Sequence, residues 1–362
     1  MNIKLLHILE TADGGLATYL CLLDQNLPSS WEQSLVVPTG DATNFDAGMS
    51  VKTFKADKRS VTGIWRMIQT MRHTLRSDQP DIVFFHSTFS LLGLMAARMT
   101  GWRGRAVYCS HGWAQSRYDE GCWKARLVAA IEGRLCGLAD VTINISDADQ
   151  NLAIQSGYKG RHVLVENAVP PPAPTVRADL FADEPDALHL LFVGRLDHQK
   201  GYDLLLSAFE EAYKTRKDLR LHVVGASVRA DSAASALPEG VTSAGWIDRA
   251  TIDDWYASAD ALIVPSRWEG FGLVVPEALR NGTPALVSDR GALPALVTSK
   301  QTGETFSLEG RSLVDCLLTL DRSNLRSRAE PCKKSYQQRF SIARWSTEIQ
   351  SLFNDLMTEK KT

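Results

Sequence analysis

The fold of this chain is decided by the stretch Ser266-Arg-Trp-Glu-Gly-Phe-Gly-Leu-Val-Val-Pro-Glu-Ala-Leu-Arg-Asn-Gly282. It follows the apolar run 261–264, which is short and branched and ends at a proline, as a buried parallel strand should. The two glycines of Gly-Phe-Gly predict the turn from that strand into a helix, because glycine lets the backbone come close to a ligand. We expect this helix to begin near Leu273 and to end at the Asn-Gly pair.

Two carboxylates of this stretch flank the expected helix start. Glu269 precedes the helix and Glu277 lies in its second turn. The free N–H groups and the positive dipole end of the helix make an anion-binding site between them. A diphosphate at the helix tip, with a carboxylate on either side for hydroxyl groups, describes a nucleotide-sugar better than most ligands.

Length and composition predict a soluble protein of two domains. The chain has 362 residues, of which 44% are hydrophobic and 23% charged, and its net charge of −2 gives no overall reason to expect nucleic-acid binding. The sequence has no apolar run of membrane-spanning length and no signal-peptide layout at its start. Its six scattered cysteines show no metal-binding spacing and indicate reduced thiols in a cytoplasm.

The N-terminal half alternates strand and helix patterns, which predicts a parallel sheet covered on both faces. Ligands of such sheets collect at the carboxyl ends of the strands, where Gly14-Gly15, His86 and His111 fall. The expected strands are 3–9, 35–37, 81–85, 105–109 and 141–145.

The same alternation restarts after a stretch rich in proline, which cannot continue a helix or an interior strand. The loop from Gly194 to Gly201 leads from the first strand of this half into a helix. The chain then closes with an amphipathic helix from 342 to 356, which must pack on another surface. The expected strands here are 188–193, 219–224, 261–264 and 284–287, with a further strand at Val241.

Taken together, these loops resemble the retaining GT-B glycosyltransferases of family 4, the glycosyl transferases group 1 type. The resemblance covers nearly the whole chain and is densest from Phe192 to Thr305. Where that family often has an acidic residue after a Gly-x-x-Pro turn, this chain has Ala295. The four matching motifs are Gly14-Gly15, His111 in Ser-His-Gly, Gly194-Arg195 with Lys200-Gly201, and Glu269 with Glu277 on either side of Gly-Phe-Gly-Leu.

The resemblance implies two Rossmann-like domains that face an inter-domain cleft. It divides the chain into an acceptor-binding domain at 1–168, a Pro-rich linker at 169–187, a nucleotide-sugar-binding domain at 188–340, and a C-terminal helix at 341–362 that packs back on the first domain. The implied reaction moves a hexose from a nucleotide-sugar to a glycan or lipid-linked glycan, as in polysaccharide or lipopolysaccharide biosynthesis. The resemblance further implies retention of the anomeric configuration, no cofactor and no metal ion.

The implied catalytic task is to stabilise the nucleoside diphosphate as it leaves with growing negative charge. Arg195 and Lys200 would clamp the pyrophosphate, since Arg can bind two oxygens in one plane and Lys acts as a point charge. The helix N-terminus after Gly272 would add its N–H groups. The alternative for both cations is a solvated surface position, which is the usual fate of Arg and Lys.

The remaining matched residues would hold the ribose and the transferred sugar. Glu277 would accept hydrogen bonds from the ribose hydroxyls, and Glu269 would meet hydroxyls of the sugar. His111 would lie beside the donor sugar, through its side chain or its backbone carbonyl. Retention in this group is usually explained by front-face attack, in which the leaving phosphate takes the acceptor proton. Further nucleotide-sugar contacts would come from Gly14, Gly15, Gly270, Phe271, Gly272 and Leu273.

Other interpretations of the same residues remain. A GT-B-like nucleotide-sugar epimerase or a non-catalytic nucleotide-sugar-binding partner could share these motifs, and donor turnover distinguishes them. Asp147-Ala-Asp149 has the Asp-x-Asp form of metal-dependent transferases, but it directly follows Ser146 after a strand. An N-cap with an acidic first turn explains this sequence better.

Charge is unevenly distributed along the N-terminal half. From Lys52 to Arg134 there are 14 Lys and Arg against 6 Asp and Glu, interleaved with four tryptophans. A basic, tryptophan-bearing face would suit peripheral docking on the anionic inner face of the cell membrane, where a lipid-linked acceptor could be presented. A solvated face over an ordinary core is the alternative. The four tryptophans are Trp65, Trp102, Trp113 and Trp123.

Overall fold

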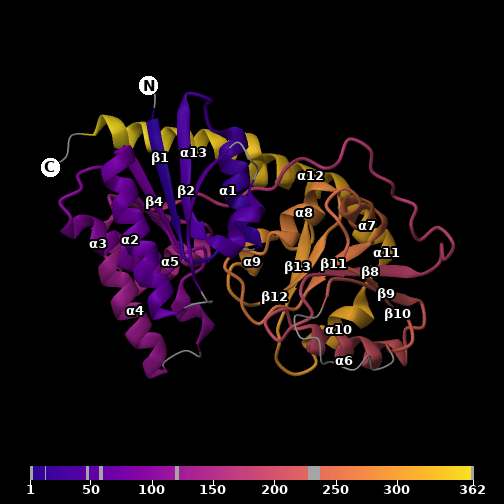
Figure 1. Cartoon of the computed structure of the whole chain (residues 1–362). Helices are drawn as coiled ribbons and strands as arrows, with labels where there is room; N and C mark the ends of the chain where they lie inside the picture. Colours follow the sequence, from indigo (N-terminus) through magenta and orange to yellow (C-terminus); the bar gives the residue numbers. More distant parts are fainter. Residues whose placement is uncertain are drawn as a thin grey trace. The chain divides into compact units, whose positions relative to one another are not determined.

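The computed structural model describes residues 3–12, 14–45, 49–56, 60–118, 122–226 and 237–359. The chain divides into two compact units. Unit 1 contains Met1–Asn167 together with Ile342–Thr362, and unit 2 contains Ala168–Ser341. Each has its own sheet, helices and hydrophobic core (Figure 1). None of the helices described combines the length and the apolar composition that crossing a membrane requires.

The sheet of unit 1 is parallel at every strand pair described, as the alternating pattern predicts. In the part of the chain that is described, seven strands run in the order β3-β2-β1-β4-β5-β6-β7. The two edge strands, β3 and β7, were not predicted. The bounds are β1 (Ile3–Leu9), β2 (Trp31–Pro38), β3 (Ser50–Phe54), β4 (Ile82–His86), β5 (Arg105–Cys109), β6 (Val141–Asn144) and β7 (His162–Leu164).

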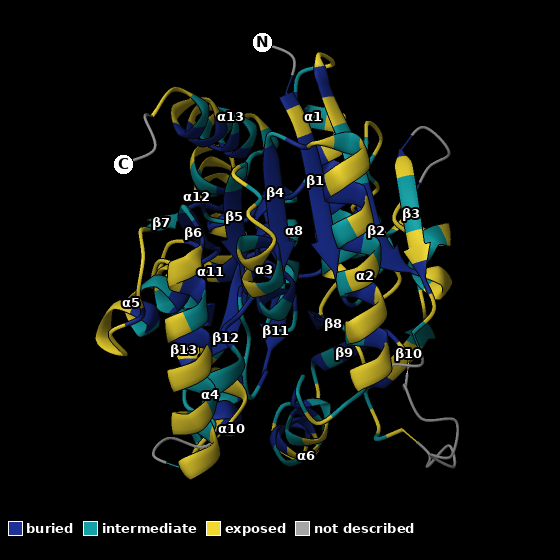
Figure 2. Cartoon of the chain, turned by 60° about the vertical axis from the view of Figure 1, so that its left-hand side comes forward, coloured by how far each residue is buried: buried dark blue, intermediate teal, exposed yellow. Residues whose placement is uncertain are grey.

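Helices cover both faces of this sheet, and Figure 2 shows its buried strands beneath helices with exposed outer sides. Alternate residues of a strand face opposite sides, so Phe85 packs in the core with α2 and α3, whereas Phe84 and His86 face α1 and α13. The helices are α1 (Gly15–Asn26), α2 (Val61–Asp78), α3 (Ser90–Met99), α4 (Trp123–Leu135), α5 (Asp147–Gln155) and α13 (Ile342–Thr358), with short turns η1 (Thr39–Asn44), η2 (Ala114–Arg117) and η3 (Cys136–Leu138).

The C-terminal helix α13 is part of unit 1 although 174 residues of unit 2 precede it in the chain (168 to 341). Its apolar stripe includes Trp345 and Phe353, which are both buried. Phe353 stacks on Trp31 with ring centroids 5.9 Å apart, and the Ser346 hydroxyl donates to the carbonyl of Asn26 at 2.9 Å. Burial of this stripe explains why the amphipathic pattern is present.

Unit 2 repeats the same architecture. Among the residues described, its sheet has six strands in the order β10-β9-β8-β11-β12-β13, again parallel. The strands are β8 (Leu188–Val193), β9 (Leu219–Val224), β10 (Val241–Gly245), β11 (Ala261–Val264), β12 (Ala285–Ser288) and β13 (Gly303–Phe306). The helices are α6 (Tyr202–Tyr213), α7 (Ile252–Ser258), α8 (Val274–Arg280), α9 (Leu293–Leu296), α10 (Ser312–Thr319), α11 (Arg322–Ser327) and α12 (Ala329–Ser335), followed by the π-helical turn η4 (Tyr336–Phe340).

The proline-rich segment 169–187, predicted as a linker, is held along unit 2. The N–H of Ala173 donates to Asp253 Oδ2 at 2.9 Å, and the N–H of Leu180 donates to Ser258 Oγ at 3.1 Å. Because the segment adds no strand to the sheet, side chains of α7 take up these N–H groups. Unit 2 therefore begins at residue 168 rather than at 188.

Both sheets reverse their strand order once, between β1 and β4 in unit 1 and between β8 and β11 in unit 2. Crossovers on either side of such a reversal run to opposite faces of the sheet, so the two loops that leave the adjacent strands separate. Ligands of open parallel sheets bind at this point. The predicted Gly14, Lys200 and Glu269 lie in the loops after β1, β8 and β11, and the predicted His86 is the last residue of β4.

We predict that Phe353→Ala destabilises unit 1 by about 3–5 kcal/mol, because the fully buried ring leaves a cavity against Trp31 and Phe84. Denaturant unfolding followed by tryptophan fluorescence measures the change. The matched control is Asn354→Ala at an exposed position of the same helix, with an expected change within about 0.5 kcal/mol. Equal effects of the two substitutions would contradict the assigned packing of α13.

Candidate active site

The two loops at the strand reversal of unit 2 are tied to each other. Arg267 N–H donates to the carbonyl of Gln199 at 2.8 Å, and the Gln199 side chain donates to the carbonyl of Trp268 at 3.3 Å. Gly201, with φ of 68°, lies where a Cβ atom would come within 2.0 Å of the Pro265 carbonyl oxygen. Only glycine allows this approach, so the Lys-Gly pair of the first loop is set against the end of β11.

Lys200 and Glu269, predicted separately, form an ion pair here. The Lys200 ammonium donates to Glu269 Oε1, which also accepts from the Ser266 hydroxyl at 3.0 Å. The Glu269 side chain is only 8% exposed, and a carboxylate that is so buried requires a partner. An ammonium has three N–H donors, so Lys200 can hold Glu269 and still offer donors to an anion.

Arg195 lies in the same loop with a more open side chain. Its guanidinium donates to Gln199 Oε1 at 2.9 Å and lies 3.1 Å from Asp197 Oδ2, while half of the side chain is exposed. Asp197 also accepts from the Lys200 N–H at 3.0 Å, which closes the loop as a turn. These contacts leave guanidinium N–H groups facing solvent, where they could bind an anion.

The glycine turn after β11 places its backbone rather than its side chains at the site. Gly272 has φ of 95°, a conformation that favours glycine. Phe271 points the other way: its ring is buried and lies 6.0 Å from the ring of Phe340. Any contact of Phe271 with a donor must therefore use its backbone. Helix α8 begins at Val274, one residue after the expected Leu273.

Glu277 faces a partner that the sequence did not reveal. Its Oε2 accepts from the Tyr256 hydroxyl of α7 at 2.8 Å. Burial of the carboxyl is the main cause that raises its pKa above the usual range, while Arg280 and the Tyr256 hydrogen bond act in the opposite direction. The side chain is partly exposed, so it is held at one oxygen and able to accept further hydrogen bonds.

The glycine pair of unit 1 begins helix α1. Gly14 has φ of 58° and ψ of −127°, which only glycine adopts readily, and a Cβ there would point into open space. The preceding backbone is fixed by the η1 turn, because Asp41 accepts from the Ala12 N–H at 2.7 Å. Gly15 is the first residue of α1, whose Tyr19 reaches back to the sheet.

His111 follows β5 in a strained conformation, with φ of 54°. Such a backbone is uncommon outside glycine and is often retained at functional sites. Its Nε2 lies 2.9 Å from Nδ1 of His86, and the edge of the Tyr19 ring packs on it with centroids 4.9 Å apart. Burial lowers the pKa of His111 to about 3, so the imidazole is neutral at pH 7.

Four polar side chains near the predicted residues were not predicted. Ser266 and Tyr256 hold the two glutamates, Glu10 accepts from the hydroxyl of Ser87 at the ends of β1 and β4, and Gln33 contacts His7. Glu10 directly follows β1 and Ser266 lies two residues after β11, which is a signal that sequence analysis could have used. Nothing in the sequence links Tyr256 to Glu277 or Gln33 to His7.

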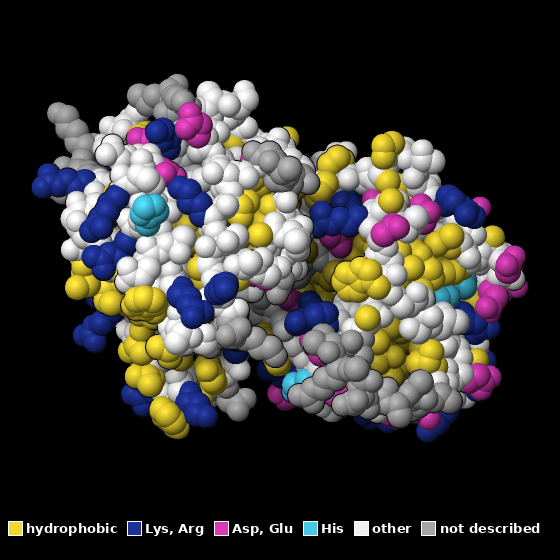
Figure 3. All heavy atoms as spheres, in the orientation of Figure 1, with side chains coloured by type: hydrophobic (Ala, Val, Ile, Leu, Met, Phe, Trp, Pro, Cys, Tyr) yellow, Lys and Arg dark blue, Asp and Glu magenta, His cyan; other side chains and the backbone are white. Residues whose placement is uncertain are grey.

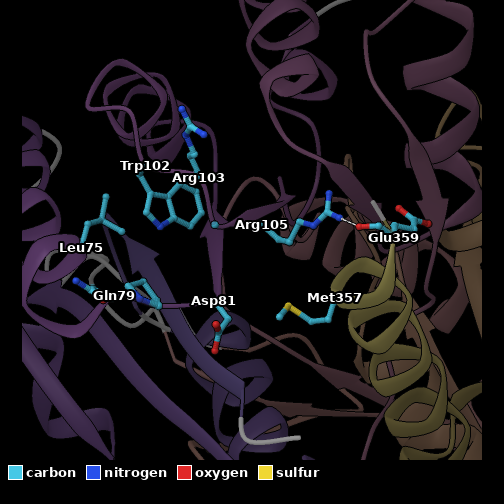
Figure 4. Close-up of a pocket in the computed structure, with 10 residues that line it drawn as sticks. Leu75, Gln79, Asp81, Trp102, Arg103, Arg105, Met357 and Glu359 are labelled. Carbon is cyan, nitrogen blue, oxygen red and sulfur yellow. Dashed lines mark hydrogen bonds between the residues drawn. The ribbon is translucent and has the colours of Figure 1, made fainter. Parts of the chain in front are cut away.

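The cavity in Figure 4, of about 480 Å³, lies at the opposite edge of the unit 1 sheet. Its lining includes Asp81 and Arg105, which stand at the amino ends of β4 and β5. Arg105 donates to the Glu359 carbonyl and pairs with Asp140 at 3.3 Å, so its charge is already satisfied. This cavity is separate from the loops that follow the strand ends.

The Asp147-Ala-Asp149 sequence has the expected capping role. Ser146 Oγ accepts from the Asp149 N–H at 3.1 Å at the start of α5. Asp149 is buried, its Oδ2 has no hydrogen-bond partner, and burial raises its pKa to about 7.

Known structures share this architecture over the full chain. A sucrose-phosphate synthase from Thermosynechococcus elongatus superposes with a TM-score of 0.84 at 18% identity, covering 98% of this chain and 99% of that one. Anabaena HepE, solved in complex with UDP and glucose, has a TM-score of 0.78 at 18% identity over 98% and 100%. The two parallel-sheet units thus form a GT-B fold.

Sequence relatives narrow this class. A glycosyl transferase 4-like domain matches residues 14–168, and a glycosyl transferases group 1 domain matches residues 177–309. The chain belongs to the group 1 glycosyltransferases of GT-B fold.

Two curated relatives illustrate its neighbours within the family. An uncharacterized 41.2 kDa protein in the cps region of Klebsiella pneumoniae is 26% identical over 87% of this chain and 88% of that protein. The lipopolysaccharide core biosynthesis mannosyltransferase LpsB of Rhizobium meliloti is 32% identical over 45% of this chain and 50% of its own length.

We predict that Asp149→Asn stabilises the protein more at pH 8 than at pH 5. The folded pKa of about 7 lies above the unfolded value of about 3.9, so the folded state binds the extra proton and the wild type loses stability as pH rises from about 4 to 7. Asparagine cannot ionise, and the difference between the two pH values should be roughly 2–3 kcal/mol. Denaturant unfolding at both pH values measures it, with the exposed Asp147→Asn as the control. A pH-independent effect of Asp149→Asn would contradict the assignment.

Proposed function

We propose that the chain is a retaining hexosyltransferase that moves a sugar from a nucleotide-sugar to a glycan or lipid-linked glycan without a metal ion. The observation that carries this proposal is the ion pair of Lys200 and Glu269 at the strand reversal of unit 2. It joins a cation suited to phosphate with a carboxylate suited to hydroxyl groups. Structures of HepE with UDP-glucose and the lipopolysaccharide mannosyltransferases among the relatives support this choice of substrates.

The leaving diphosphate would bind between the two loops. Lys200 keeps one donor on Glu269 and offers others to a phosphate oxygen, and Arg195 swings its half-exposed guanidinium onto the second phosphate. The backbone N–H groups of the turn at Gly272 add neutral donors. Together these groups stabilise charge where it develops in the transition state.

The sugar and ribose would be held by the carboxylates. Glu277 accepts from the ribose hydroxyls while Tyr256 fixes its other contact, and Glu269 accepts from hydroxyls of the transferred sugar. In unit 1, His111 and the Gly14-Gly15 turn would meet the donor sugar. Each charge-assisted hydrogen bond contributes about 1.5–3 kcal/mol.

The reaction then needs no protein nucleophile. The bond between the anomeric carbon and the phosphate oxygen breaks, and its electron pair leaves with the nucleoside diphosphate. The acceptor hydroxyl oxygen attacks from the same face and forms the new C–O bond, and its proton passes to the departing phosphate oxygen. Arg195 and Lys200 would take the charge-neutralising role that a metal ion has in other transferases.

We predict that one of a panel of UDP-, GDP- and ADP-sugars releases its nucleoside diphosphate when incubated with the protein and membrane lipid extracts. Glu277→Gln should lower kcat/KM for that donor by about 10–100-fold, because a neutral amide makes weaker hydrogen bonds to the ribose. Coupled detection of the released diphosphate measures both. Release of the sugar as a stereoretained glycoside distinguishes transfer from epimerisation.

The control variant is Glu330→Gln, an exposed carboxylate of α12, which should retain wild-type kinetics. If no donor is turned over, or if Glu277→Gln retains full activity, the proposed transferase site is wrong.

We further propose that the enzyme meets its acceptor at the cytoplasmic face of an anionic membrane. The structure corrects the tryptophan face expected from the sequence: Trp113 is buried and donates to Asn144 Oδ1 at 3.1 Å, and Trp102 packs against the core. Trp65 and Trp123 remain exposed. Of the charges counted there, those at 57–59 and 119–120 lie outside the described residues.

Helix α4 provides the docking surface. Trp123, Leu127 and Ile131 recur every fourth residue and are 69%, 52% and 50% exposed, so they form one apolar stripe. The exposed basic residues Lys124, Arg126 and Arg134 flank it, and the helix's one acid is buried. Figure 3 shows hydrophobic and basic side chains together over this lower part of unit 1. An apolar stripe with basic flanks fits an anionic bilayer, where each Lys or Arg adds roughly 1 kcal/mol.

We predict that the protein sediments with vesicles of phosphatidylcholine and phosphatidylglycerol, less with pure phosphatidylcholine, and less at high salt. Leu127→Ser should weaken binding about tenfold, since full burial of a leucine side chain contributes roughly 1.5–3 kcal/mol and the bilayer would bury only the exposed half of this one. Ile154→Ser is the matched control, because Ile154 is 61% exposed and belongs to another helix, α5. Equal binding by both variants, or no binding at low salt, would rule out this surface.

A further inference from the structure

Three histidines of unit 1, two in the neighbouring strands β1 and β4 and one shortly after β5, form a continuous hydrogen-bonded row. His7 of β1 has its Nδ1 3.0 Å from Nε2 of His86, the last residue of β4, and Nδ1 of His86 lies 2.9 Å from Nε2 of His111. Successive rings meet edge to edge, with centroids 5.3 and 5.2 Å apart and interplanar angles of 27° and 23°. His7 and His86 are fully buried. In each contact, Nδ1 of one histidine lies opposite Nε2 of the next.

At the His7 end of this row, the donor and acceptor roles are fixed by Gln33. Gln33 of β2 donates its amide N–H to Asp24 Oδ1 at 3.3 Å, and a carboxylate can only accept. The amide oxygen of Gln33 therefore faces His7 Nε2, at 3.2 Å. Because that oxygen is also only an acceptor, His7 must hold its proton on Nε2.

The same reasoning passes along the row. A neutral imidazole has one N–H and one lone pair, so His7 Nδ1 accepts and His86 Nε2 donates. His86 Nδ1 in turn accepts from His111 Nε2–H. Neutrality follows from burial, which lowers the pKa of His7 to about 4 and that of His111 to about 3.

We infer that Asp24, Gln33, His7 and His86 act as positioning residues that fix His111 in its neutral Nε2–H form, with the Nδ1 lone pair as its available acceptor. The proposed function has His111 contact the donor sugar without saying how. The row adds that His111 accepts a hydrogen bond there through Nδ1. A lone pair accepts a hydrogen bond from a hydroxyl group, whereas an imidazolium would attract phosphate. The row thus selects a sugar hydroxyl as the partner of His111, and this last step rests on the proposed function.

The ligand-free protein tests the tautomers directly. Two-bond ¹H–¹⁵N correlation spectra of the eight histidines, assigned with single His→Gln variants, distinguish Nε2–H from Nδ1–H and from the imidazolium. We expect His7, His86 and His111 all in the Nε2–H form at pH 7. An Nδ1–H form or an imidazolium at any of the three would overturn the inference.

Substitutions at Gln33 test the direction of the row. Gln33→Lys places only donors opposite His7 Nε2 and should convert all three histidines to the Nδ1–H form. Gln33→Glu offers only acceptors and should keep the Nε2–H form, so it is the matched control for side-chain length. Circular dichroism checks that both variants are folded, and an unchanged tautomer pattern in a folded Gln33→Lys protein would contradict control by Gln33.

Kinetics test the consequence for the sugar. With a turned-over donor, kcat/KM of Gln33→Lys should be about tenfold below that of Gln33→Glu, because His111 then presents an N–H in place of an acceptor. Equal values would show that no hydroxyl bonds to Nδ1, while the tautomer result stands by itself. Absence of any turnover would refute the transferase proposal but not the row, which the spectra measure without substrate.

Discussion

The candidate donor site depends on one property of parallel sheets: adjacent loops separate only where the strand order reverses. In unit 2 this happens between β8 and β11, and the loops that leave those strands carry Lys200 and Glu269. A buried carboxylate without a partner would be costly, so the ion pair fixes both side chains before any donor arrives. Gly201 makes the pair geometrically feasible, since any Cβ there would collide with the end of β11. The strand order thus creates the space for the site, and the ion pair of Lys200 and Glu269 fixes the side chains in it.

Much of this could be predicted from sequence, because the strong signals are local. Buried central strands read as apolar runs, and the glycine turns, Lys200, Glu269 and Glu277 all lie beside them. The features that could not be predicted have physical reasons as well. Edge strands β3 and β7 are partly exposed and lack a continuous apolar run. The partners Tyr256 and Gln33 become neighbours of Glu277 and His7 only when separate elements pack, and burial of Trp113 depends on Asn144 across the sheet. The proline-rich segment 169–187 has the composition of a linker, and its hydrogen bonds to α7 side chains form only when the chain folds.

The two strand reversals carry different electrostatics on the same topology. In unit 2 the reversal presents an ammonium and a guanidinium beside carboxylates, which suits a ligand whose charge grows during the reaction. In unit 1 it presents neutral imidazoles, because burial removes their protons at pH 7. A neutral acceptor discriminates between its partners only by hydrogen-bond direction. The strained backbone of His111 and its fixed tautomer are therefore consistent with one task, namely orienting an uncharged group.

The apolar stripe on α4 is not a by-product of core packing. In an ordinary surface helix the large apolar residues face inward and polar residues face solvent. In α4 the fully buried positions are Glu132 and Gly133, the apolar Ala129 and Leu135 pack against the core only in part, and Trp123 and Leu127 face outward. The inner face has its own reasons, since Glu132 accepts from Thr88 Oγ1 and the Ala114 N–H, and the Tyr158 ring leaves no room for a Cβ at Gly133. Folding therefore gains little from the outer side chains, and an external surface that they contact explains best why they lie beside flanking cations.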